Sequence, residues 1–177
     1  MQVARRLFIV PLADNNHGKT SMLNALLAQG LGRKSPEQKG IRELIGPTGR
    51  SIDAYVFVRS YQEKEKKKNR SVEEALDKND PLWKERELII LPSHVHISGT
   101  DIDEMIAAAH GAGFDVICAS VLLDRNDRQS ASSIWRKGWD ERWTILNPRQ
   151  EDTERCSMQL AALGCDLWGW ICKALTP

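Results

Sequence analysis

Short apolar runs alternate with amphipathic stretches along this chain. Residues 7–12 and 114–123 are mostly apolar, which is typical of strands covered on both faces of a parallel sheet. Residues 20–29 instead place apolar side chains at helical spacing, and glycines follow them. Alternation of this kind is typical of βαβ units, so it predicts an α/β fold.

The remaining segments extend this prediction. Three more carry the apolar, β-branched and aromatic residues of strands: 52–60, 87–91 with a continuation to 97 left open, and 143–146. Two more have helical spacing: 102–110, and 154–175 with interruptions around Gly164 and Gly169. Residues 31–51 are rich in Gly, Pro, Lys and Arg and are interpreted as a long loop.

Residues 61–87 differ from the rest of the chain. They hold eight basic and eight acidic residues, so we expect a charged insertion with a solvated surface. Ser71 and Glu74 have the spacing of a capping box, which predicts a short helix that stops near Asn79-Asp80-Pro81. We therefore expect one domain over 1–177, with a mostly parallel sheet of about five strands and helices on both faces.

Composition narrows the classes of function. Lys and Arg total 25 and Asp and Glu total 24 among 177 residues, which argues against a dedicated nucleic-acid or polybasic membrane binder. The apolar start at 7–10 is soon cut by Pro11 and Asp14, so no signal peptide is expected. The cysteines form no CxxC, and buried thiols in a cytoplasmic protein are favoured over disulfides for Cys118, Cys156, Cys165 and Cys172.

The segment 13–20, Ala-Asp-Asn-Asn-His-Gly-Lys-Thr, carries the clearest chemistry. It lies between a predicted buried strand and a predicted amphipathic helix, and it has the spacing of the phosphate-binding loop GxxxxGK(S/T), with Ala13 in place of the first Gly. Backbone N–H groups there would point at a phosphate, Lys19 would reach the β- and γ-phosphates, and the Thr20 hydroxyl would bind Mg²⁺. A loop that merely happens to contain Gly-Lys-Thr is the alternative.

In these residues the chain resembles the P-loop NTPase superfamily. The resemblance implies a three-layer nucleotide-binding domain, with a cofactor site built from Ala13, Asp14, Asn15, Asn16, His17, Gly18, Lys19, Thr20 and Ser21. Residues 16–26 look closer to the loops of translation-factor GTPases than to those of most ATPases, but no DxxG follows a predicted strand and no NKxD occurs. We therefore expect ATP with Mg²⁺, and GTP stays open.

A second Mg²⁺-binding acid, the Walker B residue, would complete such a site. Asp124 follows the apolar 121–123 and is the formal match. The third predicted strand has the more usual position but runs into Pro92-Ser93-His94. No Glu follows either strand, which favours a kinase-like or switch-like protein over a robust ATP hydrolase.

Several residues are candidates for the acceptor side of such a site. Asp53 lies at the start of the second predicted strand, near the point where many P-loop kinases place a general base; a surface Asp is the alternative. Ser93 and His94 are candidate substrate contacts beyond a strand end. His94 and His96 have metal-ligand spacing, but no third ligand is apparent in the sequence.

The segment 125–150 is a candidate lid. Arginines at this stage of P-loop kinases clamp the transferring phosphate, which would give Arg125 and Arg128 a catalytic role; a salt-bridged surface helix is the alternative. Trp135, Trp139 and Trp143 recur every four residues, so they are predicted to share one helical face. Core packing is favoured for that face, and if exposed it would mark a surface for a protein partner.

Together these patterns favour a phosphotransferase of the P-loop kinase type that uses ATP·Mg²⁺ and an unidentified acceptor. A nucleotide-dependent switch or NTPase with a protein partner is the alternative, because of the charged insertion and the GTPase-like helix sequence. A degenerate loop that binds nucleotide or anion only structurally is the third reading. No membrane or nucleic-acid role is expected.

Overall fold

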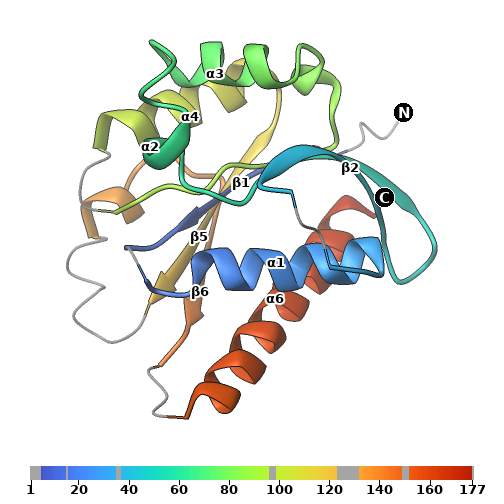
Figure 1. The fold of residues 1–177 in the computed structure, drawn as a ribbon. Helices are drawn as coiled ribbons and strands as arrows, with labels where there is room; N and C mark the ends of the chain where they lie inside the picture. The colour runs from blue at the N-terminus through green and yellow to red at the C-terminus, as the bar shows by residue number, and fades with distance from the viewer. Residues whose placement is uncertain are drawn as a thin grey trace.

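A six-stranded sheet in the order β2-β3-β4-β1-β5-β6 forms the centre of the molecule (Figure 1). The computed structural model describes residues 5–14, 16–34, 37–95, 99–122, 132–148 and 152–176. The strands are β1 (Leu7–Leu12), β2 (Lys39–Ile45), β3 (Ser51–Phe57), β4 (Leu88–Ile90), β5 (Asp115–Leu122) and β6 (Glu141–Leu146). β2 is antiparallel to β3 and all other neighbours are parallel, which confirms a mostly parallel sheet.

Strand β1 lies in the interior of this sheet. Leu7 pairs with Leu88 of β4 on one side and with Asp115 of β5 on the other. The side chains of Leu7 and Ile9 belong to one core cluster, and those of Phe8 and Val10 belong to the second. A strand buried on both faces needs apolar residues at every position, so the continuous run 7–12 is explained.

Helices cover both faces of the sheet (Figure 1). On one face α1 (Lys19–Leu31) packs along α6 (Thr153–Leu175). On the other lie α2 (Tyr61–Lys64), α3 (Val72–Asn79), the 3₁₀ turn η1 (Trp83–Glu85) and α4 (Gly99–Gly111). The α/β architecture with helices on both faces is therefore confirmed.

Strand β2 corrects the prediction of a long loop at 31–51. Its side chains alternate: Arg42 and Leu44 are buried, whereas Ile41 and Glu43 are exposed. The hairpin closes where Gly46 donates its N–H to the carbonyl of Arg50, 2.8 Å away. An edge strand with one polar face has the composition of a loop, so the sheet has six strands instead of the expected five.

Helix α6 corrects a second prediction, because it runs without interruption from Thr153 to Leu175. Gly164 lies where α6 crosses α1, and a Cβ at this position would stand 2.6 Å from the carbonyl oxygen of Met22. Gly169 is exposed and a Cβ there would meet no atom within 4 Å. The first glycine therefore allows close helix packing, and neither glycine breaks the helix.

The segment 61–87 is only partly a solvated surface. The predicted capping box is present, since the Ser71 hydroxyl accepts the N–H of Glu74 at 3.1 Å and α3 ends at Asn79. However, Trp83 is fully buried and stacks on Phe114, with ring centroids 5.9 Å apart. The segment 61–87 therefore has an apolar side that packs on the sheet, which its charged composition did not indicate.

The three tryptophans do not share a helical face, so that prediction is wrong. Trp135 lies in a helical turn at 132–135, Trp139 follows in a loop and is buried, and Trp143 lies on β6. Trp143 packs against Trp170 of α6, with ring centroids 5.0 Å apart. Spacing alone could not show that the chain changes from helix to strand between them.

The four cysteines are free thiols; Cys118 is buried as predicted, whereas Cys156, Cys165 and Cys172 are only partly buried. Within the described part of the chain, no helix combines the length and the apolar character that a bilayer crossing would require.

Candidate functional site

The loop 13–18 begins where β1 ends and leads directly into α1. Two of its described residues have left-handed backbone, Asn16 with φ of 63° and Gly18 with φ of 86°. Glycine adopts such angles without steric cost, and asparagine tolerates them better than most residues. These two positions turn the chain from the sheet into the helix, so α1 starts at the carboxyl edge of the sheet.

The amino end of α1 has no capping side chain and no acidic residue in its first turn. Its cap residue is Gly18, which has no side chain to accept the N–H groups of the first turn. The first N–H groups of any helix lack partners within the helix, and the helix dipole adds positive potential there. This end of α1 therefore favours an anion.

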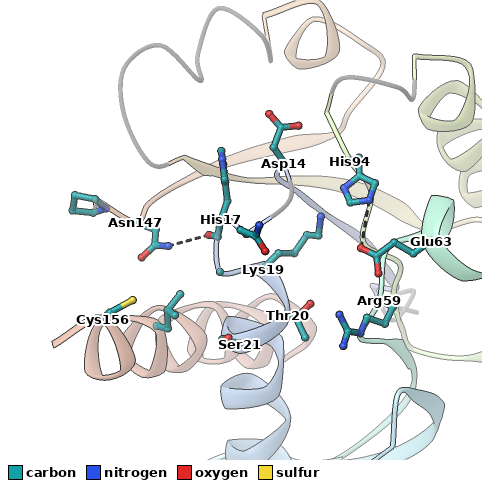
Figure 2. Close-up of a pocket in the computed structure, with 14 residues that line it drawn as sticks. Asp14, His17, Lys19, Thr20, Ser21, Arg59, Glu63, His94, Asn147 and Cys156 are labelled. Atoms are coloured by element: carbon teal, nitrogen blue, oxygen red, sulfur yellow. Dashed lines mark hydrogen bonds and ion pairs between the residues drawn. The ribbon is translucent and has the colours of Figure 1, made fainter. Parts of the chain in front are cut away.

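A cavity of about 930 Å³ opens over this helix end (Figure 2). Seven of the predicted loop residues line it: Asp14, Asn16, His17, Gly18, Lys19, Thr20 and Ser21. Ala13 is buried behind the loop with 1% of its surface exposed, and Asn15 lies outside the described residues. The structure thus gathers most of the predicted cofactor residues around one cavity.

Lys19 is the most deeply buried charged group of the cavity, with 6% of its surface exposed. Its Nζ donates to the carbonyl oxygens of Ala13 at 2.9 Å and Ser93 at 3.2 Å. Burial lowers the pKa of this amine to about 8, although the nearby carboxylates of Glu63 and Asp14 act in the opposite direction. The amine is therefore held between the ends of β1 and β4, at the edge of the cavity.

The chain beyond β4 continues to follow β1. Ser93 donates its N–H to the carbonyl of Pro11 at 2.9 Å and accepts the N–H of Ala13 at 3.3 Å. Gln62 of α2 fixes the next residue, because its Oε1 accepts the N–H of His94 at 3.1 Å. These contacts bring His94 into the cavity, as expected for a residue beyond a strand end.

His94 lies beside Glu63 at the cavity wall, with 3.4 Å between Nε2 and Oε1 (Figure 2). Burial lowers the pKa of His94, the charge of Lys19 acts in the same direction, and Glu63 opposes them. Glu63 and Asp14 are the carboxylates among the described residues that line the cavity. Sequence analysis missed Glu63, whose neighbours are nearly all polar and charged.

The end of β6 and helix α6 form the opposite wall. Asn147 donates its side-chain N–H to the carbonyl of His17 at 2.9 Å (Figure 2). It also accepts a hydrogen bond from Gln159 of α6 at 2.6 Å. A Cβ at Gly18 would stand 2.5 Å from Leu160 and 2.8 Å from Asn147. Gly18 is thus favoured by its backbone angle, and a side chain there would also displace the ends of the Leu160 and Asn147 side chains.

Arg59 and Thr20 lie together at the end of β3 (Figure 2). The Thr20 hydroxyl lies 3.5 Å from the carbonyl oxygen of Val58, to which it donates. Arg59 is exposed, and its Nε donates to Gln38 at 2.9 Å. It adds a cation to the cavity that sequence analysis missed; its place directly after an apolar strand was the available signal.

Asp53 does not reach this cavity. Its neighbour Ala54 pairs with Leu88, and Leu88 pairs with Leu7, so Asp53 lies at the amino ends of the parallel strands. The loop 13–18 lies at their carboxyl ends. Asp53 instead forms an ion pair with Arg86, 2.7 Å away. The structure therefore separates the predicted general base from the predicted phosphate loop.

Other predicted site residues fall outside the described part of the chain: Asp124, Arg125, Arg128 and His96. Of the candidate lid, Lys137 pairs with Asp103 at 2.6 Å and Arg142 donates to the carbonyl of Trp135 at 2.6 Å. Neither is among the described residues that line the cavity.

The described residues of the cavity offer few ligands for a metal ion. No group of three or more His, Cys, Asp or Glu side chains that could hold a metal is present among the residues that the structure describes. Mg²⁺ prefers oxygen ligands and usually keeps several waters beside one or two carboxylates and substrate phosphates. The Thr20 hydroxyl and the carboxylates of Glu63 and Asp14 are oxygen donors of this kind among the described residues that line the cavity.

No family model matches the chain, and no curated protein is significantly similar to it. The resemblance of residues 13–20 to the P-loop NTPase superfamily thus stays a prediction.

Proposed function

We propose that the protein binds the phosphates of a nucleoside triphosphate, with ATP expected, and transfers a phosphoryl group to an acceptor. One observation carries the proposal: the buried Lys19 amine and the uncapped amino end of α1 face the same cavity of about 930 Å³. A cation and a row of N–H groups that meet in one cavity favour a multiply charged anion.

In this proposal, phosphate oxygens accept hydrogen bonds from the first N–H groups of α1 and from the Lys19 amine. Lys19 already donates to the carbonyls of Ala13 and Ser93, so its side chain is oriented before any ligand arrives. A bound anion favours the protonated amine and raises its pKa from about 8. The Thr20 hydroxyl and the Asp14 carboxylate would hold Mg²⁺, which would neutralise phosphate charge.

Three residues that line the cavity outside the loop supply the groups that phosphoryl transfer would need. Glu63 would accept the proton of an acceptor hydroxyl, in the role that sequence analysis assigned to Asp53. Arg59 offers a guanidinium for the charge on the transferring group. His94, whose lowered pKa favours the neutral imidazole, would hold Glu63 in place through their contact.

A nucleotide-dependent switch that binds a protein partner is the second candidate. The observation that favours it is the position of α2, whose Glu63 lines the cavity while its neighbour Lys64 is exposed on the surface. A segment with both contacts could change conformation when the γ-phosphate is bound, and a protein partner could recognise that change. A switch predicts slow hydrolysis that a partner accelerates, and a kinase predicts little hydrolysis before an acceptor is added.

The test is nucleotide binding by the wild type, by Lys19→Ala and by the control Lys34→Ala, which removes an exposed lysine just after α1. Thermal shift and calorimetry with ATP, GTP and dNTPs plus Mg²⁺ would identify the ligand. A nucleotide at about 100 Kd should add about 2.7 kcal/mol to the free energy of unfolding. Lys19→Ala should abolish this gain and Lys34→Ala should keep it; unchanged ATP affinity in Lys19→Ala would refute the proposal.

A further inference from the structure

A second, smaller cavity of about 230 Å³ lies beside the first. Arg59 lines both cavities, and α2 contributes to both through successive residues, Glu63 to the larger and Lys64 to the smaller. A group bound in the smaller cavity would therefore share the Arg59 guanidinium with a group bound in the larger one.

The smaller cavity is strongly cationic. Lys39, Arg59, Lys64 and Lys68 line it, against a single carboxylate, Glu65, among its described lining residues. Glu65 is 4% exposed and is held by Lys39 at 2.6 Å and by the Asn79 amide at 2.9 Å. Glu65 offsets one of the four positive charges, so an excess of three remains among the described lining residues.

Its inner wall is apolar. Phe57 of β3 is 2% exposed, and the Lys39 ammonium lies 6.0 Å from its ring centroid. A cavity with an aromatic wall and a cationic rim suits a ligand with a small organic body and an anionic group. An excess of three cations matches a phosphate dianion better than a single carboxylate.

We propose that this cavity binds the phosphate group of a small organic phosphate monoester, as a second ligand beside the nucleotide site. Its volume of about 230 Å³ suits a compact ligand, since cavities for drug-sized molecules start at roughly 300 Å³. That this ligand is the phosphoryl acceptor rests on the proposed function. That it binds here rests only on the cavity and its charges.

The probe is phenyl phosphate, titrated by calorimetry into the full chain with ATP absent. The double variant Lys64→Ala/Lys68→Ala removes two rim cations. The control is Lys67→Ala, an exposed lysine of the same segment that lines neither cavity. We expect at least a tenfold weaker affinity in the double variant and no change in Lys67→Ala; phenol, which lacks the phosphate group, should not bind.

Equal binding by wild type and double variant would overturn this inference, and so would an equal loss in Lys67→Ala, which would indicate a nonspecific charge effect. Phenyl phosphate binding that disappears in Lys19→Ala would also overturn it, because the probe would then occupy the larger cavity. ATP titrations of the same variants separate the two proposals. If ATP fails to bind while phenyl phosphate still requires Lys64 and Lys68, the nucleotide proposal falls and the smaller site stands.

Discussion

A methyl group added at Gly164 tests how α6 is seated against α1. In Gly164→Ala the new Cβ would stand 2.6 Å from the Met22 carbonyl oxygen, 2.8 Å from the Ala25 Cβ and 2.9 Å from the Leu26 nitrogen. These are backbone atoms and a Cβ of a regular helix, so no flexible side chain can move aside. The two helices must separate or shift along each other to accommodate the methyl group.

The magnitude follows from two opposing contributions. Overpacking of a close contact costs about 1–3 kcal/mol. Alanine is a better helix former than glycine by about 1 kcal/mol, which offsets part of that cost. We expect the free energy of unfolding to fall by up to about 2 kcal/mol, and a chain of 177 residues should then lose up to about 8 °C in Tm.

Gly169→Ala is the matched control, because it makes the same change in the same helix where a Cβ would meet no atom within 4 Å. It should raise stability by about 0.5–1 kcal/mol. Urea unfolding followed by tryptophan fluorescence measures both variants, and nucleotide affinity serves as a second readout, since Leu160 and Cys156 of α6 line the cavity. If Gly164→Ala were as stable as Gly169→Ala, the close contact between the helices would be refuted.

Three further predictions concern single side chains. Burial lowers the pKa of Lys19 from 10.5 to about 8, so the unfolded chain binds more protons than the folded chain between these pH values. The free energy of unfolding should therefore rise with pH in this range, by up to about 3 kcal/mol. Urea titrations at pH 7.5 and 9.5 should show this rise in the wild type and not in Lys19→Met. Ser71→Ala should cost about 1 kcal/mol in a denaturant titration, because it removes the acceptor for the Glu74 N–H, and undiminished stability would contradict the cap. Arg86→Met should lower the free energy of unfolding by about 3 kcal/mol, because it leaves the Asp80 carboxylate, which is 3% exposed, without its cation. Asp53→Asn should cost far less, because the Asp53 side chain is 50% exposed. Similar losses in the two variants would refute this ranking.

Elements with a strong local pattern were predictable from the sequence. The continuous apolar runs of β1 and β5, the helical stripe of α1 and the Ser71 capping box each depend on residues that are close in the chain. The loop 13–20 belongs to this group, because its glycine and its place between strand and helix are local properties. These elements agree with the structure within about two residues.

The remaining features depend on pairing between distant segments. Strand β2 forms because its polar edge pairs with β3, and nothing in 39–45 alone distinguishes it from a loop. Gly164 looked like a helix breaker until the position of α1 showed that it provides space for a neighbouring helix. In both cases the deciding contact is made by residues far away in sequence.

The site divides in the same way. The sequence by itself determined the residues of the loop 13–20, since a turn, a lysine and a hydroxyl at fixed spacing form one local unit. Only the tertiary structure brought Arg59, Glu63 and His94 to that loop, and only it moved Asp53 to the opposite edge of the sheet. The physical reason is strand direction. In a parallel sheet, residues that follow the carboxyl ends of different strands lie close together, whereas a residue at the amino end of a strand lies at the opposite edge of the sheet.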